Sequence, residues 1–96
     1  MHTRYLYCTQ YHPKGYKTLP WFEIKGNFIY KTTNHPEGKS SSPWFEIRHN
    51  TIYTTLFNTA GLQSEPWFEI KGNLIHATEN YPDGQQLRPI YEIRHK

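Results

Sequence analysis

One five-residue segment recurs along this 96-residue chain at a constant spacing of 23 residues. Pro-Trp-Phe-Glu-Ile occurs three times, and a divergent copy, Pro-Ile-Tyr-Glu-Ile, follows at the same spacing. The four copies begin at Pro20, Pro43, Pro66 and Pro89. Self-similarity at a period of 20 to 50 residues is typical of solenoids, propellers and ring-like repeat folds. The repeat therefore constrains the architecture more than any other feature of the chain.

The repeat is divided between the two ends of the chain. Three units are continuous, and the fourth is formed by the front half at the C-terminus and the back half at the N-terminus. The units are residues 20–42, 43–65, 66–88 and the split unit 89–96 plus 1–19, together one domain over 1–96. An open solenoid needs capping units at its ends, whereas a closed ring joins two half-units and leaves no free edge. The split therefore predicts a closed ring.

Each unit is typical of an antiparallel β-hairpin. Residues 21–25 are rich in aromatic and β-branched residues and predict the first strand. Gly26-Asn27 is a two-residue turn signal, and residues 28–32 form the return strand. This loop pairs Lys25 with Phe28, and the same register in the split unit pairs Arg94 with Tyr5. No segment has a helical period. We predict an all-β fold: a closed, four-fold pseudosymmetric ring of four hairpins, one of them formed by both termini.

The alternation of side chains along each strand predicts a core face and an outer face. The expected core positions are Phe22, Ile24, Ile29, Phe45, Ile47, Ile52, Phe68, Ile70, Ile75, Tyr91, Ile93 and Leu6. The expected outer face mixes large aromatic and charged residues. In the first complete unit it consists of Trp21, Glu23, Lys25, Phe28, Tyr30 and Thr32. Cys8 aligns with Lys31, Thr54 and Ala77, so we expect that place to tolerate any residue.

The repeated unit, Pro-Trp-Phe-Glu-Ile followed by Asn-x-Ile-Tyr and Pro-x-Gly, resembles that of small bacterial proteins described as four-fold β-flowers. The resemblance covers essentially the whole chain. It implies four hairpin petals about an axis and no established activity. Two other aromatic hairpin repeats fit less well, because the chain lacks the regularly placed glycines of MORN repeats and the Gly-Trp openings of choline-binding repeats.

Every unit keeps an acidic residue two positions before a basic one. The acids are Glu23, Glu46, Glu69 and Glu92, and the bases are Lys25, Arg48, Lys71 and Arg94. Residues two apart on a strand share a face, about 6.5–7 Å from each other. One interpretation is a belt of structural ion pairs, which we favour. The other is a carboxylate ring near the axis that binds a cation.

Aromatic residues also recur at equivalent places. Trp21, Trp44 and Trp67 open the predicted strands, with Ile90 in the fourth place, and Tyr30, Tyr53, Tyr7 and His76 lie on the return strands. A tryptophan beside a tyrosine and a glutamate can stack on a sugar and accept its hydroxyl hydrogens, or it can simply fill space between petals. The candidate ligand-binding residues are Trp21, Glu23, Tyr30, Trp44, Glu46, Tyr53, Trp67, Glu69 and Glu92.

Other chemistry receives little support from the sequence. The single Cys8 excludes an internal disulfide, and the six histidines, with no zinc-site spacing, are expected to be exposed turn residues. We therefore expect no metal, no cofactor and no catalytic residue. A net charge of +3 and a glutamate near every strand base make nucleic acid an unlikely partner. No apolar run is long enough to span a membrane or form a signal peptide, so we expect a cytoplasmic protein.

These features favour a non-enzymatic β-repeat module for binding or assembly. Its partner is an unknown protein or a glycan, and a homo-oligomer is compatible with the small size. The alternative function is carbohydrate binding, in the manner of a lectin, through the Trp/Tyr/Glu surface.

Overall fold

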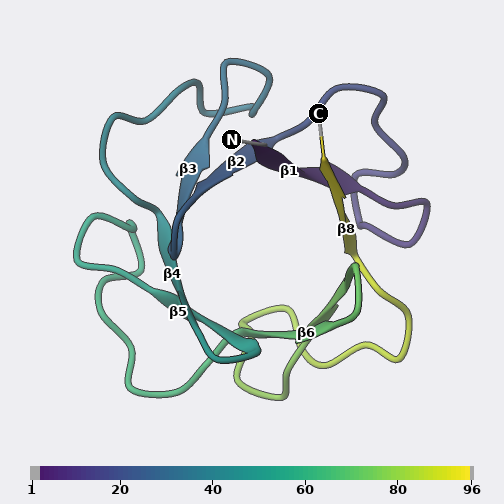
Figure 1. The fold of residues 1–96 in the computed structure, drawn as a ribbon. Helices are drawn as coiled ribbons and strands as arrows, with labels where there is room; N and C mark the ends of the chain where they lie inside the picture. Colours follow the sequence, from purple (N-terminus) through teal and green to yellow (C-terminus); the bar gives the residue numbers. More distant parts are fainter. Residues whose placement is uncertain (1–2, 96) are drawn as a thin grey trace.

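The computed structural model describes residues 3–95 and forms one closed antiparallel β-barrel (Figure 1). Each strand pairs with its neighbours in chain order, and the last strand pairs with the first. The eight strands are β1 (Arg4–Cys8), β2 (Phe22–Lys25), β3 (Phe28–Lys31), β4 (Phe45–Arg48), β5 (Thr51–Thr54), β6 (Phe68–Lys71), β7 (Leu74–Ala77) and β8 (Tyr91–His95). The all-β closed ring of four hairpins is confirmed. Within 3–95, no helix is long and apolar enough to cross a membrane.

The hairpin register follows from the two-residue turns. β2 and β3 pair Lys25 with Phe28 and Phe22 with Lys31, as predicted, and the other two continuous hairpins repeat this pattern. The first turn residue has a positive φ in all three: 62° at Gly26, 58° at His49 and 64° at Gly72. A positive φ at this place alone is the type II′ pattern, which favours glycine. The sequence signal Gly-Asn therefore identified the turn correctly.

The split unit closes the barrel. β1 and β8 pair over five residues, from Arg4 opposite His95 to Cys8 opposite Tyr91, and they include the predicted pair of Tyr5 and Arg94. The first and last strands of the described residues consequently lie side by side (Figure 1). Residues 1, 2 and 96, at the break within the split unit, lie outside the described residues.

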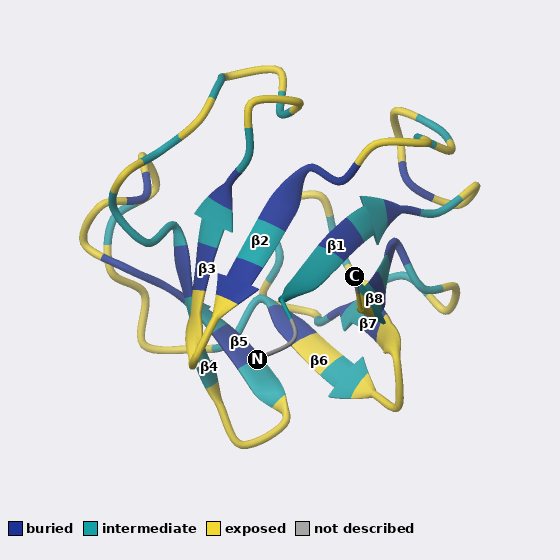
Figure 2. Ribbon diagram, turned by 45° about the horizontal axis from the view of Figure 1, so that its top comes forward, coloured by how far each residue is buried: buried dark blue, intermediate teal, exposed yellow. Residues whose placement is uncertain are grey.

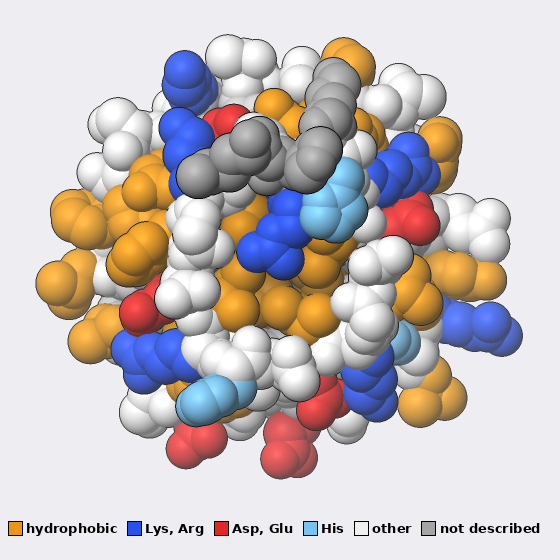
Figure 3. All heavy atoms as spheres, viewed as in Figure 1, with side chains coloured by type: hydrophobic (Ala, Val, Ile, Leu, Met, Phe, Trp, Pro, Cys, Tyr) orange, Lys and Arg blue, Asp and Glu red, His pale blue; other side chains and the backbone are white. Residues whose placement is uncertain are grey.

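The predicted core occupies the barrel interior. Ten of the twelve expected positions are buried, and the other two, Ile47 and Ile70, are partly buried against the core. The buried residues alternate along the strands (Figure 2). Apolar side chains fill the middle of the ring, and most charged side chains lie around its periphery (Figure 3).

A further inward position was not anticipated. Cys8, Lys31, Thr54 and Ala77, expected to occupy a tolerant place, are all buried. The register explains the error, because each pairs with the inward Phe22, Phe45, Phe68 or Tyr91 and so shares its face. Lys31 keeps its charge compensated there: its ammonium is 3.2 Å from a Glu37 carboxylate oxygen and 3.6 Å from the centre of the Trp44 ring.

The long loops are tied to one end of the barrel by a contact that recurs in every unit. A threonine hydroxyl after the return strand donates to the carbonyl of the proline that opens the unit, as in Thr32 to Pro20 at 2.6 Å. The equivalent pairs are Thr9–Pro89, Thr55–Pro43 and Thr78–Pro66. Each loop then turns at a glycine with positive φ, such as Gly38 at 83°. Four turns are thereby held around one end of the axis.

Deleting residues 89–96 should abolish folding. The deletion removes β8, which pairs with both β1 and β7, and takes Ile90, Tyr91 and Ile93 out of the core. The free-energy cost of two unpaired strand edges and of the lost apolar burial exceeds the net stability of a typical domain, which is roughly 5–15 kcal/mol. Circular dichroism during heating provides the measurement. A cooperative transition near the full-length melting temperature would contradict the closed ring.

A circular permutant with joined termini and new ends between Gly72 and Asn73 should fold. The new ends fall in an exposed turn, at a place in the repeat equivalent to the natural break. The permutant therefore has a continuous fourth hairpin and an open third hairpin, in place of the reverse. The free energy of unfolding, measured by urea titration, should differ from that of the parent by only a few kcal/mol. An expressed but unfolded permutant would show that the termini do not form an ordinary hairpin.

Candidate functional site

The four repeated glutamates lie on the outside of the barrel, because each follows a buried phenylalanine or tyrosine on its strand and adjacent side chains point to opposite faces. Each forms an ion pair with the base two residues on. The nitrogen–oxygen distances are 3.7 Å for Lys25–Glu23, 3.0 Å for Arg48–Glu46, 3.6 Å for Lys71–Glu69 and 2.9 Å for Arg94–Glu92. The structural interpretation is therefore confirmed, and the carboxylate ring near the axis is wrong.

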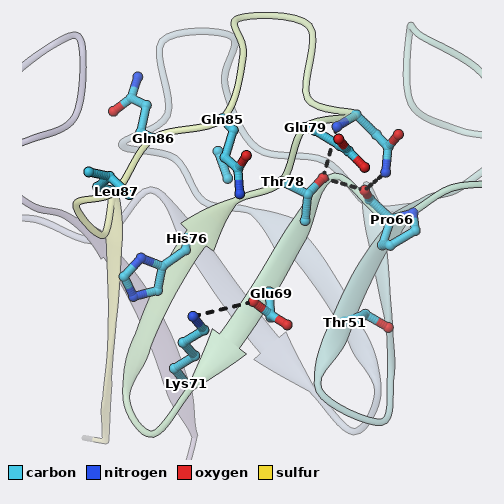
Figure 4. Close-up of a pocket in the computed structure, with 12 residues that line it drawn as sticks. Thr51, Pro66, Glu69, Lys71, His76, Thr78, Glu79, Gln85, Gln86 and Leu87 are labelled. Atoms are coloured by element: carbon cyan, nitrogen blue, oxygen red, sulfur yellow. Dashed lines mark hydrogen bonds and ion pairs between the residues drawn. The ribbon is translucent and has the colours of Figure 1, made fainter.

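The return-strand aromatics complete this outer belt. Lys25, Arg48 and Arg94 lie over the rings of Tyr30, Tyr53 and Tyr7, with 5.4, 4.7 and 4.5 Å from the cation to the ring centre. Beside the third hairpin the belt borders a groove of about 440 Å³, lined by Glu69, Lys71, His76 and Thr78 (Figure 4). No tryptophan lines this groove. The outer surface thus brings together the predicted glutamates and tyrosines without the indoles.

The tryptophans lie elsewhere. Trp21, expected on the outer face, is only 8% exposed and belongs to the core, while Trp44 and Trp67 are partly buried against it. The reason is that each tryptophan precedes its strand, where the strand alternation does not yet apply. The ring of Trp21 lies between two turn histidines, with ring centres 5.0 Å from His12 and 5.1 Å from His35. The predicted Trp/Tyr/Glu surface is therefore divided between two parts of the molecule.

The three tryptophans line a cavity at the loop end of the barrel, which we call the axial cup. Its volume is about 490 Å³. Its floor is a square of four rings in edge contact, with centres of adjacent rings 5.6–5.9 Å apart: Phe22, Phe45, Phe68 and Tyr91. The turn residues form part of its wall: His12, His35, Asn58 and Tyr81. Three exposed charged residues also line it: Lys14, Glu37 and Asp83.

His12 and His35 are part of this wall and not the exposed turn residues that we expected. His12 is 9% exposed, and its Nε2 lies 3.2 Å from the hydroxyl of Tyr91. In both residues Nδ1 accepts a backbone N–H at 3.0 Å, from Lys14 in one case and from Glu37 in the other. Burial lowers the pKa of His12 to about 4, with further contributions from Lys17 and Lys14, and burial also lowers the pKa of His35. Both imidazoles are neutral at pH 7.

The cup was missed at the sequence level, although a signal for it exists. His12, His35, Asn58 and Tyr81 occupy equivalent places in the four units. In a closed ring, equivalent loop positions that point inward must converge on the axis. The sequence does not show whether these side chains point toward the axis or toward solvent. We expected solvent, because turn residues are exposed more often than buried.

Neither a metal site nor a relative helps to define the function. Among residues 3–95, no three or more His, Cys, Asp and Glu side chains are grouped so that they could hold a metal ion. Comparison with protein-family models, curated proteins and solved structures finds no match to this chain. Function is therefore inferred from the geometry of the chain itself.

Acid should destabilise the protein through His12. Its pKa is 6.5 when unfolded and about 4 when folded, so the unfolded state takes up the proton first. The stabilising contribution is complete above pH 6.5 and is lost as the pH falls toward 4, by about 3 kcal/mol at most. Urea unfolding at several pH values from 7.5 to 4.5 measures this slope.

His12→Asn is the matched variant, because Asn58 occupies the same place in the second unit and accepts the N–H of Ala60 through its side chain. Its stability should fall less steeply with pH than that of the parent. Parallel curves for the two proteins would exclude His12 as the source of the slope.

Proposed function

We propose that this protein is a non-enzymatic binding module that takes a small ring-bearing molecule into the axial cup. One observation carries the proposal: the three tryptophans, the four floor rings and the four dissimilar turn residues of the repeats line a single cavity. The aromatic lining and the volume of about 490 Å³ are in the range of small-molecule sites.

Comparison of equivalent positions in the four units distinguishes residues that the fold requires from residues that vary between units. Ile24, Ile47, Ile70 and Ile93 are the same residue in all units, because each fills the same part of the barrel. At the wall of the cup the units instead carry two histidines, an asparagine and a tyrosine, and Ile90 replaces one tryptophan. Four-fold symmetry broken around a cavity suits a ligand that is itself asymmetric.

The ionisable groups favour binding over catalysis. Burial raises the pKa of the Cys8 thiol to about 12, so it is not a nucleophile at neutral pH. The repeated glutamates are held in ion pairs on the outer face and do not reach the cup.

If the protein binds carbohydrate, the site is expected in the axial cup, because the tryptophans lie there and not on the outer surface. A pyranose has a flat apolar face that stacks on indole, and the indoles line the cup and not the glutamate belt. Sugars are therefore one class in the set of ligands to be tested. We further propose that the chain is related to the four-fold β-flower proteins, a relation supported by the four hairpins and the closure through both termini.

The ligand should be detected through intrinsic fluorescence. All three tryptophans of the chain line the cup, so a ligand there should change the emission excited at 295 nm in a saturable way. Monosaccharides, nucleosides and simple aromatic compounds form the test set. Trp67→Ile copies the natural Ile90 and should weaken binding roughly tenfold, because it removes one aromatic wall.

Tyr53→His is the control, because it copies His76 on the outer belt and leaves the cup intact. Binding that survives Trp67→Ile but is lost in Tyr53→His would place the ligand on the outer surface. Absence of any saturable change across the set would overturn the proposed cup.

A further inference from the structure

Two hydrogen-bond donors lie near the floor of the cup on adjacent repeats, and they restrict the ligand that the proposed function calls for. The first is the hydroxyl of Tyr91. The backbone N–H of Lys14 donates to Nδ1 of His12, so the proton of the neutral ring is on Nε2. Nε2–H then donates to the Tyr91 oxygen at 3.2 Å. The phenolic hydrogen has no acceptor among residues 3–95 and is available to the cup.

The second donor is Nε2–H of His35. His35 has the same placement over Phe22 as His12 has over Tyr91: the ring centres are 5.1 Å apart in both pairs, with interplanar angles of 61° and 60°. Its Nδ1 likewise accepts the backbone N–H of Glu37 at 3.0 Å. Phe22 lacks the hydroxyl that receives the proton of His12. Nε2–H of His35 therefore points toward the place of a missing oxygen, and no side chain of the described residues accepts it.

The first donor belongs to the floor ring Tyr91, and the second lies over the neighbouring floor ring, Phe22. The rings of Phe22 and Tyr91 are neighbours, with centres 5.6 Å apart and planes at 83°. The planes of adjacent floor rings stand at 72–83° to one another, so neighbouring rings meet edge to face.

The cup has few free amide or carboxylate acceptors. The Asn58 side-chain oxygen already accepts the N–H of Ala60, and the Glu37 carboxylate is paired with Lys31. Asp83 is the one lining carboxylate with no ion pair among residues 3–95, and it lies at the exposed mouth. An ammonium group at the floor would therefore face donors and lose its hydration without replacement.

We infer that the ligand is a ring-bearing molecule with a carbonyl or carboxylate oxygen, and that this oxygen accepts hydrogen bonds from Tyr91 Oη and His35 Nε2. The ring of the ligand lies above, among the tryptophans. This inference rests on the proposed function, since it names the ligand class of the same cup.

The test uses four compounds of similar size: benzamide, benzoate, benzylamine and toluene. They present a neutral acceptor, an anionic acceptor, a cationic donor and no polar group. Dissociation constants come from titrations of ¹⁵N-labelled protein, with the three tryptophan indole N–H signals as reporters. Benzamide or benzoate should bind at least tenfold more tightly than benzylamine and toluene. The better of the two identifies the oxygen as a carbonyl or a carboxylate.

Two variants assign the donors, and both copy residues that the repeat already accepts. Tyr91→Phe copies Phe22, and His35→Asn copies Asn58. Each should weaken binding of the preferred acceptor at least fivefold and leave toluene binding unchanged. His76→Tyr, which copies Tyr30 on the outer belt, is the control and should change neither.

The outcomes separate the inference from the proposed function. Equal binding of all four compounds, or unchanged acceptor binding in both variants, overturns the inference while the cup remains a binding site. The same holds if only monosaccharides bind and Trp67→Ile weakens their binding. If no compound in either set binds at millimolar concentration, the proposed function fails as well.

Discussion

The antiparallel pairing of β1 with β8 is the contact on which the rest of the structure depends. It joins the first and last described strands over five residue pairs and converts a row of hairpins into a ring. Without it the outer strands would be edges with unpaired N–H and C=O groups, and the interior would be open on one side. Because the ring is closed, each floor ring contacts its equivalents from the two neighbouring units, and a small chain obtains an enclosed core.

Closure also divides the interior into two parts. Toward the hairpin turns, isoleucines fill the space between the strands, as Ile29, Ile52 and Ile75 do with almost no exposure. Toward the long loops, the square of four aromatic rings ends this core and becomes the floor of the axial cup. The same phenylalanines and Tyr91 therefore stabilise the barrel on one side and shape a cavity on the other. This dual position is the reason why Tyr91 can replace phenylalanine: its hydroxyl lies at the boundary and receives the N–H of His12.

The outer surface is governed by a different balance. Each glutamate pairs with the base two residues along, and three of these bases also lie over an aromatic ring. Such exposed pairs contribute little individually to stability. They do neutralise the charge locally on every hairpin, so the belt presents a mixed polar surface. The asymmetry that distinguishes the four units is concentrated at the loop end, where the turns differ.

Much of the fold was determined by the sequence alone, because its signals are local and repeated. The spacing of 23 residues, the Gly-Asn turns and the alternation around Phe22 and Ile24 specify the hairpins, their register and their core face, and the split unit specifies closure. The candidate site was decided by the tertiary structure. Trp21 and His12 lie just outside the strands, where no period predicts a direction, and only the closed ring brings them to one cavity. Lys31 is buried because strand pairing places it opposite Phe22, and the contacts with Trp44 and Glu37 that make this tolerable come from residues brought together by folding.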